Sequence, residues 1–359
     1  MTSRQRFLET ALFGQPDRIP YYPGGPRQST YDRWYTEGLP QGKGVGEVLG
    51  LDHWEGVGVN LGPLPAFEET LLEDRGDHKI WIDSLGARRL DFTVDATPGF
   101  VTRTWLEFPV HDRDSFRQMT QRFDPGDPAR YPGDWLQRVE RYRDRDFVVN
   151  LTIPWLFWRV RDWVGFEGLC TLCLDDPPFV HEMMEFVTEF TLQAIQRAVT
   201  EVEIDFVFLN EDMAYKTASM ISPQMVREFM LPRYRRLVEF LHGHGVRVIV
   251  LDCDGHISEL IPLWLEVGVN ATWPVEIAAG NDPVAYRRQF PEGLCLMGGI
   301  DKRELRFDRK RVRREVMSKV PWLIEQGGYI PSVDHGVPPD VPYDNFAYMW
   351  HLIQHIATS

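Results

Sequence analysis

Short apolar runs alternate with longer amphipathic stretches along most of the chain. The runs are of strand length, and several are apolar on both faces, which is typical of parallel strands buried between two layers. Eight of them are predicted to be inner strands, at residues 19–23, 53–59, 147–151, 205–209, 247–251, 269–274, 294–298 and 329–333.

Amphipathic stretches between these runs predict helices at 177–202, 223–244, 301–326 and 343–356. In the clearest one Ser222 is the expected N-cap, Pro223 takes the first helical position and Gly245 ends the helix. The alternation fits either a closed (β/α)8 barrel or an open doubly wound sheet. The second needs a glycine-rich phosphate turn, and its nearest match, residues 24–26, contains a proline. The sequence therefore predicts a (β/α)8 barrel.

A long segment, about 62–145, separates the second predicted strand from the third. Within it, residues 79–95 and 99–109 alternate like the two arms of an antiparallel hairpin, and two helices are expected to follow. We interpret the segment as an insertion that walls one side of the barrel mouth. Because no linker or change in composition marks a boundary, 1–359 is predicted to be a single barrel domain.

Composition excludes several classes of function. With 53 acidic against 39 basic residues the net charge is −14, which argues against a nucleic-acid-binding protein. No apolar run approaches the length of a membrane span, and the first residues show no signal peptide. Four cysteines fit a reducing compartment, so a cytoplasmic protein is expected. Cys170 and Cys173 have metal-site spacing but lie on an apolar helix turn without a second pair, which favours core packing.

Candidate chemistry gathers just after the predicted strands, where barrel enzymes carry their active sites. Asp252 and Asp254 are two residues apart, so in an extended chain they point to the same side, with Cys253 opposite. Together with His335 they could bind a divalent metal such as zinc, manganese or iron. The alternative is structural: Asp254 caps a helix that starts near His256, and Asp252 is a hydrogen-bonded residue at the strand end.

Glu211 and Asp212 follow the fourth strand and cannot both point into the barrel. We expect Glu211 to be the catalytic or ligating one. His335 is a candidate acid or base because the free pKa of imidazole lies near neutrality. A pocket for a planar substrate could be lined by aromatic residues near the strand ends: Trp155, Trp158, Tyr215, Trp273 and Tyr329.

Several segments, in order, resemble the uroporphyrinogen decarboxylase superfamily. They are Ile330-Pro-Ser-Val-Asp-His-Gly-Val-Pro-Pro-Asp340 with Asn345, Ile221-Ser-Pro to Pro232, Phe147 to Pro154-Trp155, Gly298-Gly-Ile-Asp301, and Arg4-Gln-Arg-Phe to Asp17-Arg-Ile-Pro20. The resemblance spans nearly the whole chain and implies a (β/α)8 barrel. Function within the superfamily divides between two branches.

The true decarboxylases remove carboxylates from a porphyrinogen without a cofactor and hold its acidic arms with an arginine-rich stretch. Here that region supplies only Arg27, and the family's aspartate after the second strand is not evident, Glu55 and Asn60 being the nearest polar residues. His335 does fall where the decarboxylases place a histidine. The resemblance to the decarboxylase branch is therefore partial.

The cobalamin-linked methyltransferases bind zinc through His-x-Cys after the fifth strand and a cysteine in the last loop. At these positions this chain has Asp252, Asp254 and His335. Thiolates suit activation of a thiol substrate. The Asp, Asp, His set implies a harder metal, suited to polarising a methoxy oxygen or an amine nitrogen.

Three functions follow from the resemblance. The first is metal-dependent methyl transfer from a small methylated substrate to a corrinoid on a partner protein, with Glu211, His335 and Asp252 catalytic, zinc the expected metal and a homodimer the expected assembly. The second is cofactor-free decarboxylation of uroporphyrinogen or a similar tetrapyrrole. The third is a protein that binds a corrinoid or tetrapyrrole with little catalysis. The residues expected to bind substrate are Arg27, Trp155, Tyr215 and His256.

Overall fold

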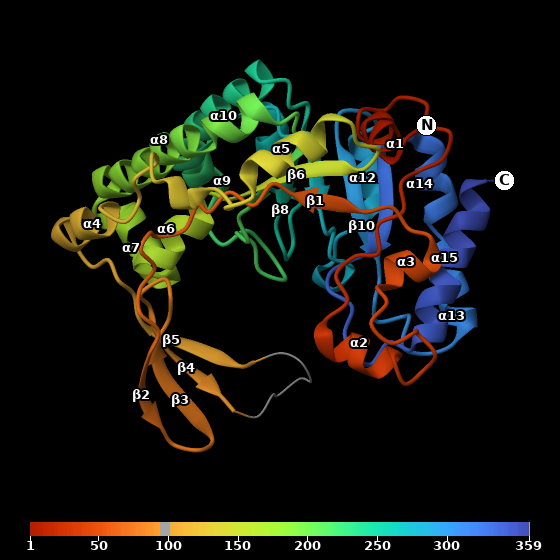
Figure 1. Ribbon diagram of the computed structural model, residues 1–359, viewed down its shortest axis with the longest axis horizontal. Helices are drawn as coiled ribbons and strands as arrows, with labels where there is room; N and C mark the ends of the chain where they lie inside the picture. Colours follow the sequence, from red (N-terminus) through yellow and green to blue (C-terminus); the bar gives the residue numbers. More distant parts are fainter. Residues whose placement is uncertain (94–100, 359) are drawn as a thin grey trace.

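The computed structural model describes residues 1–93 and 101–358. Its centre is a curled parallel sheet of seven strands, in the order β1-β6-β7-β8-β9-β10-β11. Helices cover its outer face (Figure 1), and the predicted α/β barrel architecture is confirmed. Each strand corresponds to a predicted one: β1 (Trp54–Gly56), β6 (Val148–Pro154), β7 (Phe206–Asn210), β8 (Val248–Asp252), β9 (Ala271–Trp273), β10 (Cys295–Ile300) and β11 (Tyr329–Val333).

The first predicted strand, 19–23, does not form a ladder, and that part of the prediction is wrong. Pro20 and Pro23 have no amide hydrogen, so two of the five positions cannot donate to a neighbouring strand. The amide of Tyr21 donates to the side chain of Asp52 at 2.9 Å, and its carbonyl accepts from the Asp52 amide at 2.8 Å. The segment nevertheless takes the eighth position, because Tyr22 packs inside the barrel with residues of the seven strands.

The barrel interior is filled by inward-facing side chains of the strands, and α1 closes its amino-terminal end. Phe7 of α1 lies 5.0 Å, between ring centroids, from Phe206 at the start of β7 and 6.1 Å from Tyr22. A second, larger core packs between the strands and the helix layer. Towards the carboxyl ends of the strands the filling stops: Thr152 of β6 is exposed, so the barrel is open at its mouth.

The described residues contain fifteen α-helices, none of which is long and apolar enough to cross a membrane. They are α1 (Ser3–Ala11), α2 (Gln28–Trp34), α3 (Val45–Leu49), α4 (Arg113–Thr120), α5 (Trp135–Arg143), α6 (Leu156–Val164), α7 (Phe166–Asp175), α8 (Pro177–Glu201), α9 (Pro223–Met225), α10 (Leu231–Gly243), α11 (Ile261–Glu266), α12 (Pro283–Gln289), α13 (Arg309–Met317), α14 (Val320–Gln326) and α15 (Tyr343–Ala357).

Two predicted helices are divided. Ser222 caps α9 as expected, accepting from the Met225 amide, but a π-helical turn, Val226–Met230, separates α9 from α10. Pro232 explains the wide turn, because proline cannot donate in the helix and its ring crowds the carbonyl of the preceding turn. The predicted helix 301–326 forms α13 and α14 only, since Asp308 caps α13 and Pro321 opens α14.

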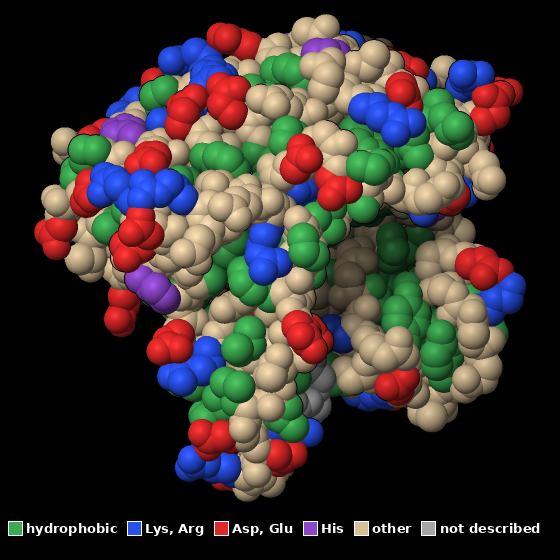
Figure 2. All heavy atoms as spheres, turned by 60° about the vertical axis from the view of Figure 1, so that its left-hand side comes forward, with side chains coloured by type: hydrophobic (Ala, Val, Ile, Leu, Met, Phe, Trp, Pro, Cys, Tyr) green, Lys and Arg blue, Asp and Glu red, His purple; other side chains and the backbone are tan. Residues whose placement is uncertain are grey.

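The insertion after β1 carries a four-stranded antiparallel sheet of β2 (Thr70–Asp74), β3 (His78–Ile82), β4 (Arg88–Phe92) and β5 (Arg103–Glu107), followed by α4 and α5. It projects from the rest of the molecule (Figure 1). The predicted hairpin is wrong in detail: its first arm, 79–95, folds into both β3 and β4 because Asp83 accepts from the Leu85 and Ala87 amides and makes a turn. Residues 94–95 at the end of the first predicted arm and 99–100 at the start of the second lie outside the described residues. A deep hollow lies beside the sheet (Figure 2).

Candidate functional site

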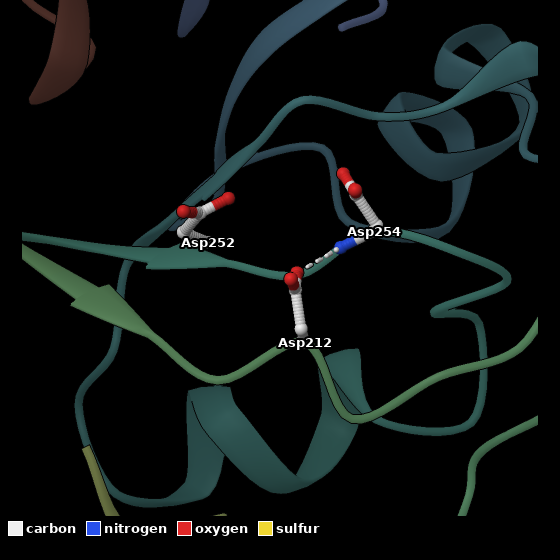
Figure 3. Close-up of side chains that lie close together, drawn as sticks. All are labelled: Asp212, Asp252 and Asp254. Atoms are coloured by element: carbon white, nitrogen blue, oxygen red, sulfur yellow. Dashed lines mark hydrogen bonds between the residues drawn. The ribbon is translucent and has the colours of Figure 1, made fainter. Parts of the chain in front are cut away.

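Three carboxylates converge at the carboxyl ends of β7 and β8. Asp212, Asp252 and Asp254 each offer an oxygen, and these oxygens lie within 4.8 Å of one another (Figure 3). Asp252 is the last residue of β8 and Asp254 lies two residues on, so the predicted same-side pair is present. Cys253 faces away: its sulfur accepts from the Met213 amide at 3.3 Å in the buried layer behind.

The structure reverses the predicted orientations of Glu211 and Asp212. Glu211 is completely buried, and its carboxylate accepts from the Phe157 and Trp158 amides at 2.7 and 3.1 Å and from the Tyr234 hydroxyl. It therefore holds the amino-terminal turn of α6 and does not reach the mouth. Asp212 joins the cluster because its φ of 43° turns the chain back, and its Oδ1 accepts from the Asp254 amide at 3.1 Å.

Burial and mutual repulsion shape the electrostatics of the cluster. The pKa of Asp252 is raised well above its ordinary value, first by burial and then by the charges of Asp212 and Asp254, against a hydrogen bond from Asn210 at 2.6 Å. Burial also raises the pKa of Asp212, with Asp254 the next cause. Three carboxylates this close are stable only with protons or a cation among them.

His335, in the loop after β11, pairs with the cluster through Asp254. Its Nε2 lies 3.1 Å from Asp254 Oδ2, and this hydrogen bond is the largest cause of a raised pKa at His335. The imidazole stacks on Trp273 of β9, with centroids 6.1 Å apart and planes at 29°. Trp273 in turn contacts Phe208 of β7, so two aromatic rings lie beside the acidic cluster.

Sequence reasoning missed a second set of charged groups behind His335. Asp334 is fully buried and accepts from the Ile277 and Lys302 amides at 2.9 and 3.1 Å. The Lys302 ammonium lies 3.3 Å from Asp334 and 4.0 Å from Glu276, whose other oxygen accepts from the Gly255 amide. These side chains tie together the loops after β8, β9, β10 and β11. Only their positions at strand ends could have indicated them, since their partners lie on other loops.

The residues expected to bind substrate are scattered. Arg27 is the N-cap residue of α2, and its backbone amide donates to the Val337 carbonyl just beyond His335, so it borders the mouth. Trp155 is completely buried against Tyr234 and is a core residue. Tyr215 is exposed in the loop after β7. His256 uses both ring nitrogens locally, on the Ala279 carbonyl and the Ser258 hydroxyl, and does not reach the cluster.

A divalent cation fits this donor set. Asp254 Oδ1 and Asn210 Oδ1 are buried acceptors without a hydrogen-bond donor among the described residues, and both adjoin the three carboxylates. Oxygen ligands with one nearby imidazole suit hard or borderline divalent ions. Of the predicted set, Asp252 and Asp254 lie in the cluster, Asp212 is added, and His335 contacts it through Asp254.

Comparison with known proteins shows the family to which the chain belongs. The family model described as uroporphyrinogen decarboxylase (URO-D) matches residues 161–356, which is more than half of the chain. The chain belongs to the uroporphyrinogen decarboxylase family. The matched part of this family member includes the acidic cluster, His335 and the charged groups behind it.

Curated relatives in the family are distant. The chain is 26% identical over 177 residues to a uroporphyrinogen decarboxylase of Thermus thermophilus, covering 49% of each protein, and 24% identical over 153 residues to that of Legionella pneumophila (strain Paris), covering 42% of each. The chain thus spans about half the length of the curated relatives it matches. A solved methyltransferase from Methanosarcina mazei shares the fold over 99% of both chains, with a TM-score of 0.63 and 13% identity.

Proposed function

We propose that this protein transfers a methyl group from a small methylated substrate to a corrinoid carried by a partner protein in the cytoplasm, with the help of a divalent cation. The observation that carries the proposal is the convergence of Asp212, Asp252 and Asp254 beside His335 at the open mouth of the barrel. A cluster of like charges is costly in a folded protein unless protons or a cation occupy it, and a cation at the open mouth would keep all three carboxylates ionised. Zinc is the expected ion.

In this proposal the three aspartates would hold the cation. When bound, it supplies Lewis-acid polarisation of the oxygen or nitrogen that bears the methyl group. The methyl group leaves without the bonding electrons, which stay on that oxygen or nitrogen, and the acceptor provides the electron pair for the new bond. His335 is positioned to give the leaving atom its proton, because pairing with Asp254 raises the pKa of the imidazole and so favours its protonated form.

The remaining groups orient this pair. Trp273 stacks on His335 and limits rotation of the imidazole, while Phe208 and Trp273 present an apolar surface to the substrate. Asp334, with Lys302 and Glu276, fixes the loop from which His335 projects. Glu211 belongs to the supporting structure through its contacts with α6, and Arg27 at the rim is a candidate contact for an acidic group of the acceptor or substrate.

Cofactor-free decarboxylation is the second candidate, favoured by the curated relatives, which are uroporphyrinogen decarboxylases. A protonated His335 could pair with a substrate carboxylate. Against this, a porphyrinogen brings several carboxylates to a mouth that already holds three, and Coulomb repulsion opposes its binding. A third function, binding a corrinoid or tetrapyrrole without catalysis, would leave the His335–Asp254 pair without a chemical task.

The first test is metal content and affinity. We expect the protein to bind close to one divalent ion per chain, by elemental analysis and calorimetric titration with zinc. Asp252→Asn should weaken that affinity by at least about tenfold, equivalent to the loss of about 1.4 kcal/mol. Glu259→Gln changes an exposed carboxylate in the same loop region and should leave zinc affinity unchanged.

The second test is the reaction. A free reduced corrinoid is mixed with methylated ethers and amines, and methylation is followed by its absorbance change. Methylation that needs both zinc and Asp252 supports the proposal. Protein that binds no metal and instead releases carbon dioxide from a porphyrinogen would reject it in favour of decarboxylation. Corrinoid binding with no methylation from any donor would leave the binding protein as the function.

A further inference from the structure

Two rows of side chains cross one face of the four-stranded sheet. Cross-strand partners share a face, and so do residues two apart on one strand. On β2 the two positions are three apart, but a bulge between Leu71 and Glu73 brings them back into phase. The first row, called the apolar row because three of its four side chains are apolar, is Leu71, Trp81, Arg89 and Trp105. The second, the charged row, is Asp74, Lys79, Asp91 and Arg103.

This face is accessible along its two rims, whereas at its centre the side chains of Arg89 and Asp91 are only 15% and 18% exposed. The outer strands β2 and β5 are exposed along their whole length, and the side chains at the two ends of the apolar row, Leu71 and Trp105, are 57% and 48% exposed. The sheet stands clear of the barrel in both views of the molecule (Figures 1 and 2). Two large apolar side chains are therefore in contact with solvent at the two rims of this face.

The charged row of one copy could pair with the same row of a second copy that runs in the opposite direction, because the charges would then be opposite at every position. From β2 to β5 its charges alternate as minus, plus, minus, plus. Reversed, the same row reads plus, minus, plus, minus. A two-fold axis parallel to the strands would lay the face of one copy on that of another, with Asp74 opposite Arg103 and Lys79 opposite Asp91.

In the same arrangement the apolar rows of the two copies also lie on each other in opposite directions. Leu71 of one copy would meet Trp105 of the other, burying the two most exposed apolar side chains of the face. Trp81 would meet Arg89, whose guanidinium already lies 4.1 Å from the centroid of Trp81 within one chain. A second aromatic ring on the other side of that guanidinium is a favourable cation–π arrangement.

We infer that this face of the four-stranded sheet binds the same face of a second copy of the chain. Pairing through the sheet edges is less suited, because both edge ladders contain an irregularity of the kind that protects edges from further pairing. The inference does not depend on the proposed function, since none of these eight residues belongs to the acidic cluster.

The size of the face sets the strength of the dimer. Four strands of five residues, with a spacing of about 4.8 Å and a rise of about 3.3 Å per residue, present roughly 300 Å². Stable interfaces bury about 800 Å² on each partner. The dimer should therefore be weak and concentration-dependent.

The experiment measures self-association of the full chain by sedimentation velocity from about 1 to 200 μM. Trp105→Asp should weaken dimerisation at least about tenfold. Leu136→Asp is the control, because Leu136 is 73% exposed on α5, away from the sheet, and its loss should change nothing. Circular dichroism verifies that each variant is folded.

Charge exchange tests the register. Arg103→Asp and Asp74→Lys each place like charges opposite one another in their own dimer, so each alone should associate about tenfold more weakly. Mixed together they restore both opposite-charge contacts, and the mixed dimer should return to the wild-type affinity. A protein that stays monomeric at 200 μM, or a dimer that neither Trp105→Asp nor the charge variants weaken, would overturn the inference.

Discussion

Glu211 offers a direct test of how burial controls a carboxyl group in this fold. Its side chain is completely buried behind the acidic cluster, and burial raises its pKa to about 7 despite hydrogen bonds from Tyr234 and two amides of α6. In the unfolded chain the pKa is near its ordinary value of about 4.3. We predict that Glu211→Gln makes the protein more stable in alkaline solution and removes part of its pH dependence.

The direction in which the free energy of unfolding changes with pH follows from whether the folded or the unfolded state holds the proton of Glu211 more tightly. Below the unfolded pKa both states are protonated, and the buried group costs nothing. As pH rises towards 7 the unfolded chain ionises first, so the free energy of unfolding falls. Above 7 the penalty is constant, and the difference between the two pKa values corresponds to roughly 4 kcal/mol. Glutamine is neutral throughout and avoids this penalty. Its one oxygen can accept from the Phe157 and Trp158 amides, which share a single oxygen of Glu211, but its NH2 group replaces the oxygen that accepts from the Tyr234 hydroxyl.

The measurement is the free energy of unfolding in urea from pH 4.5 to 8.5. Glu211→Gln should match or fall slightly below wild type at pH 4.5 and exceed it at pH 8, with the difference growing between those limits. Glu239→Gln, which changes an exposed residue of α10, should leave the pH dependence as in wild type. Parallel stability curves for wild type and Glu211→Gln would refute the reasoning.

Three further substitutions test other parts of the structure. In metal-free protein at pH 8, Asp252→Asn should raise the thermal midpoint, because it removes one of three clustered charges; a lower midpoint in chelator would contradict the repulsion among the three aspartates. Gly255→Ala should cost about 1–3 kcal/mol, since φ is +86° and a Cβ would lie 2.5 Å from the Ala214 carbonyl oxygen, whereas Gly25→Ala, in open space, should be neutral. Asp205→Ala should lower the free energy of unfolding in urea by about 3–5 kcal/mol, because it leaves the buried Arg145 guanidinium without this carboxylate partner. Glu203→Gln, at the exposed end of the same network, should lower it by less than about 1 kcal/mol.

The sequence predicted the barrel because buried parallel strands leave uninterrupted apolar runs, and seven of these runs form the sheet. It mispredicted residues 19–23 because hydrophobicity alone does not show that Pro20 and Pro23 cannot take part in a ladder. In the insertion the apolar alternation continues through the turn at Asp83, which hid the boundary between β3 and β4.

The sequence could predict only those parts of the candidate site whose residues lie close together on one segment of the chain. Asp252 and Asp254 lie on one extended segment, so their spacing placed them on one side. The choice between Glu211 and Asp212 rested on strict alternation, which ends at Asp212, where φ is positive. Lys302, Glu276 and Asp334 come from three loops, and their association depends on the order of strands in the closed fold rather than on any spacing in the chain.

The irregular segment at residues 19–23 gives the barrel a seam. Elsewhere around the ring, separating two strands would break main-chain hydrogen bonds of a continuous ladder, but along this segment neighbours are joined mainly by side-chain packing and by the two bonds between Tyr21 and Asp52. Between residues 19 and 23 the ring is therefore held by fewer main-chain hydrogen bonds than elsewhere. At the mouth the segment ends in a paired contact: Pro26 bridges Val337, just beyond His335, with the Arg27 amide donating to Val337 and the Val337 amide donating to Gly25, so main-chain bonds fasten the ring again beside the loop that carries His335.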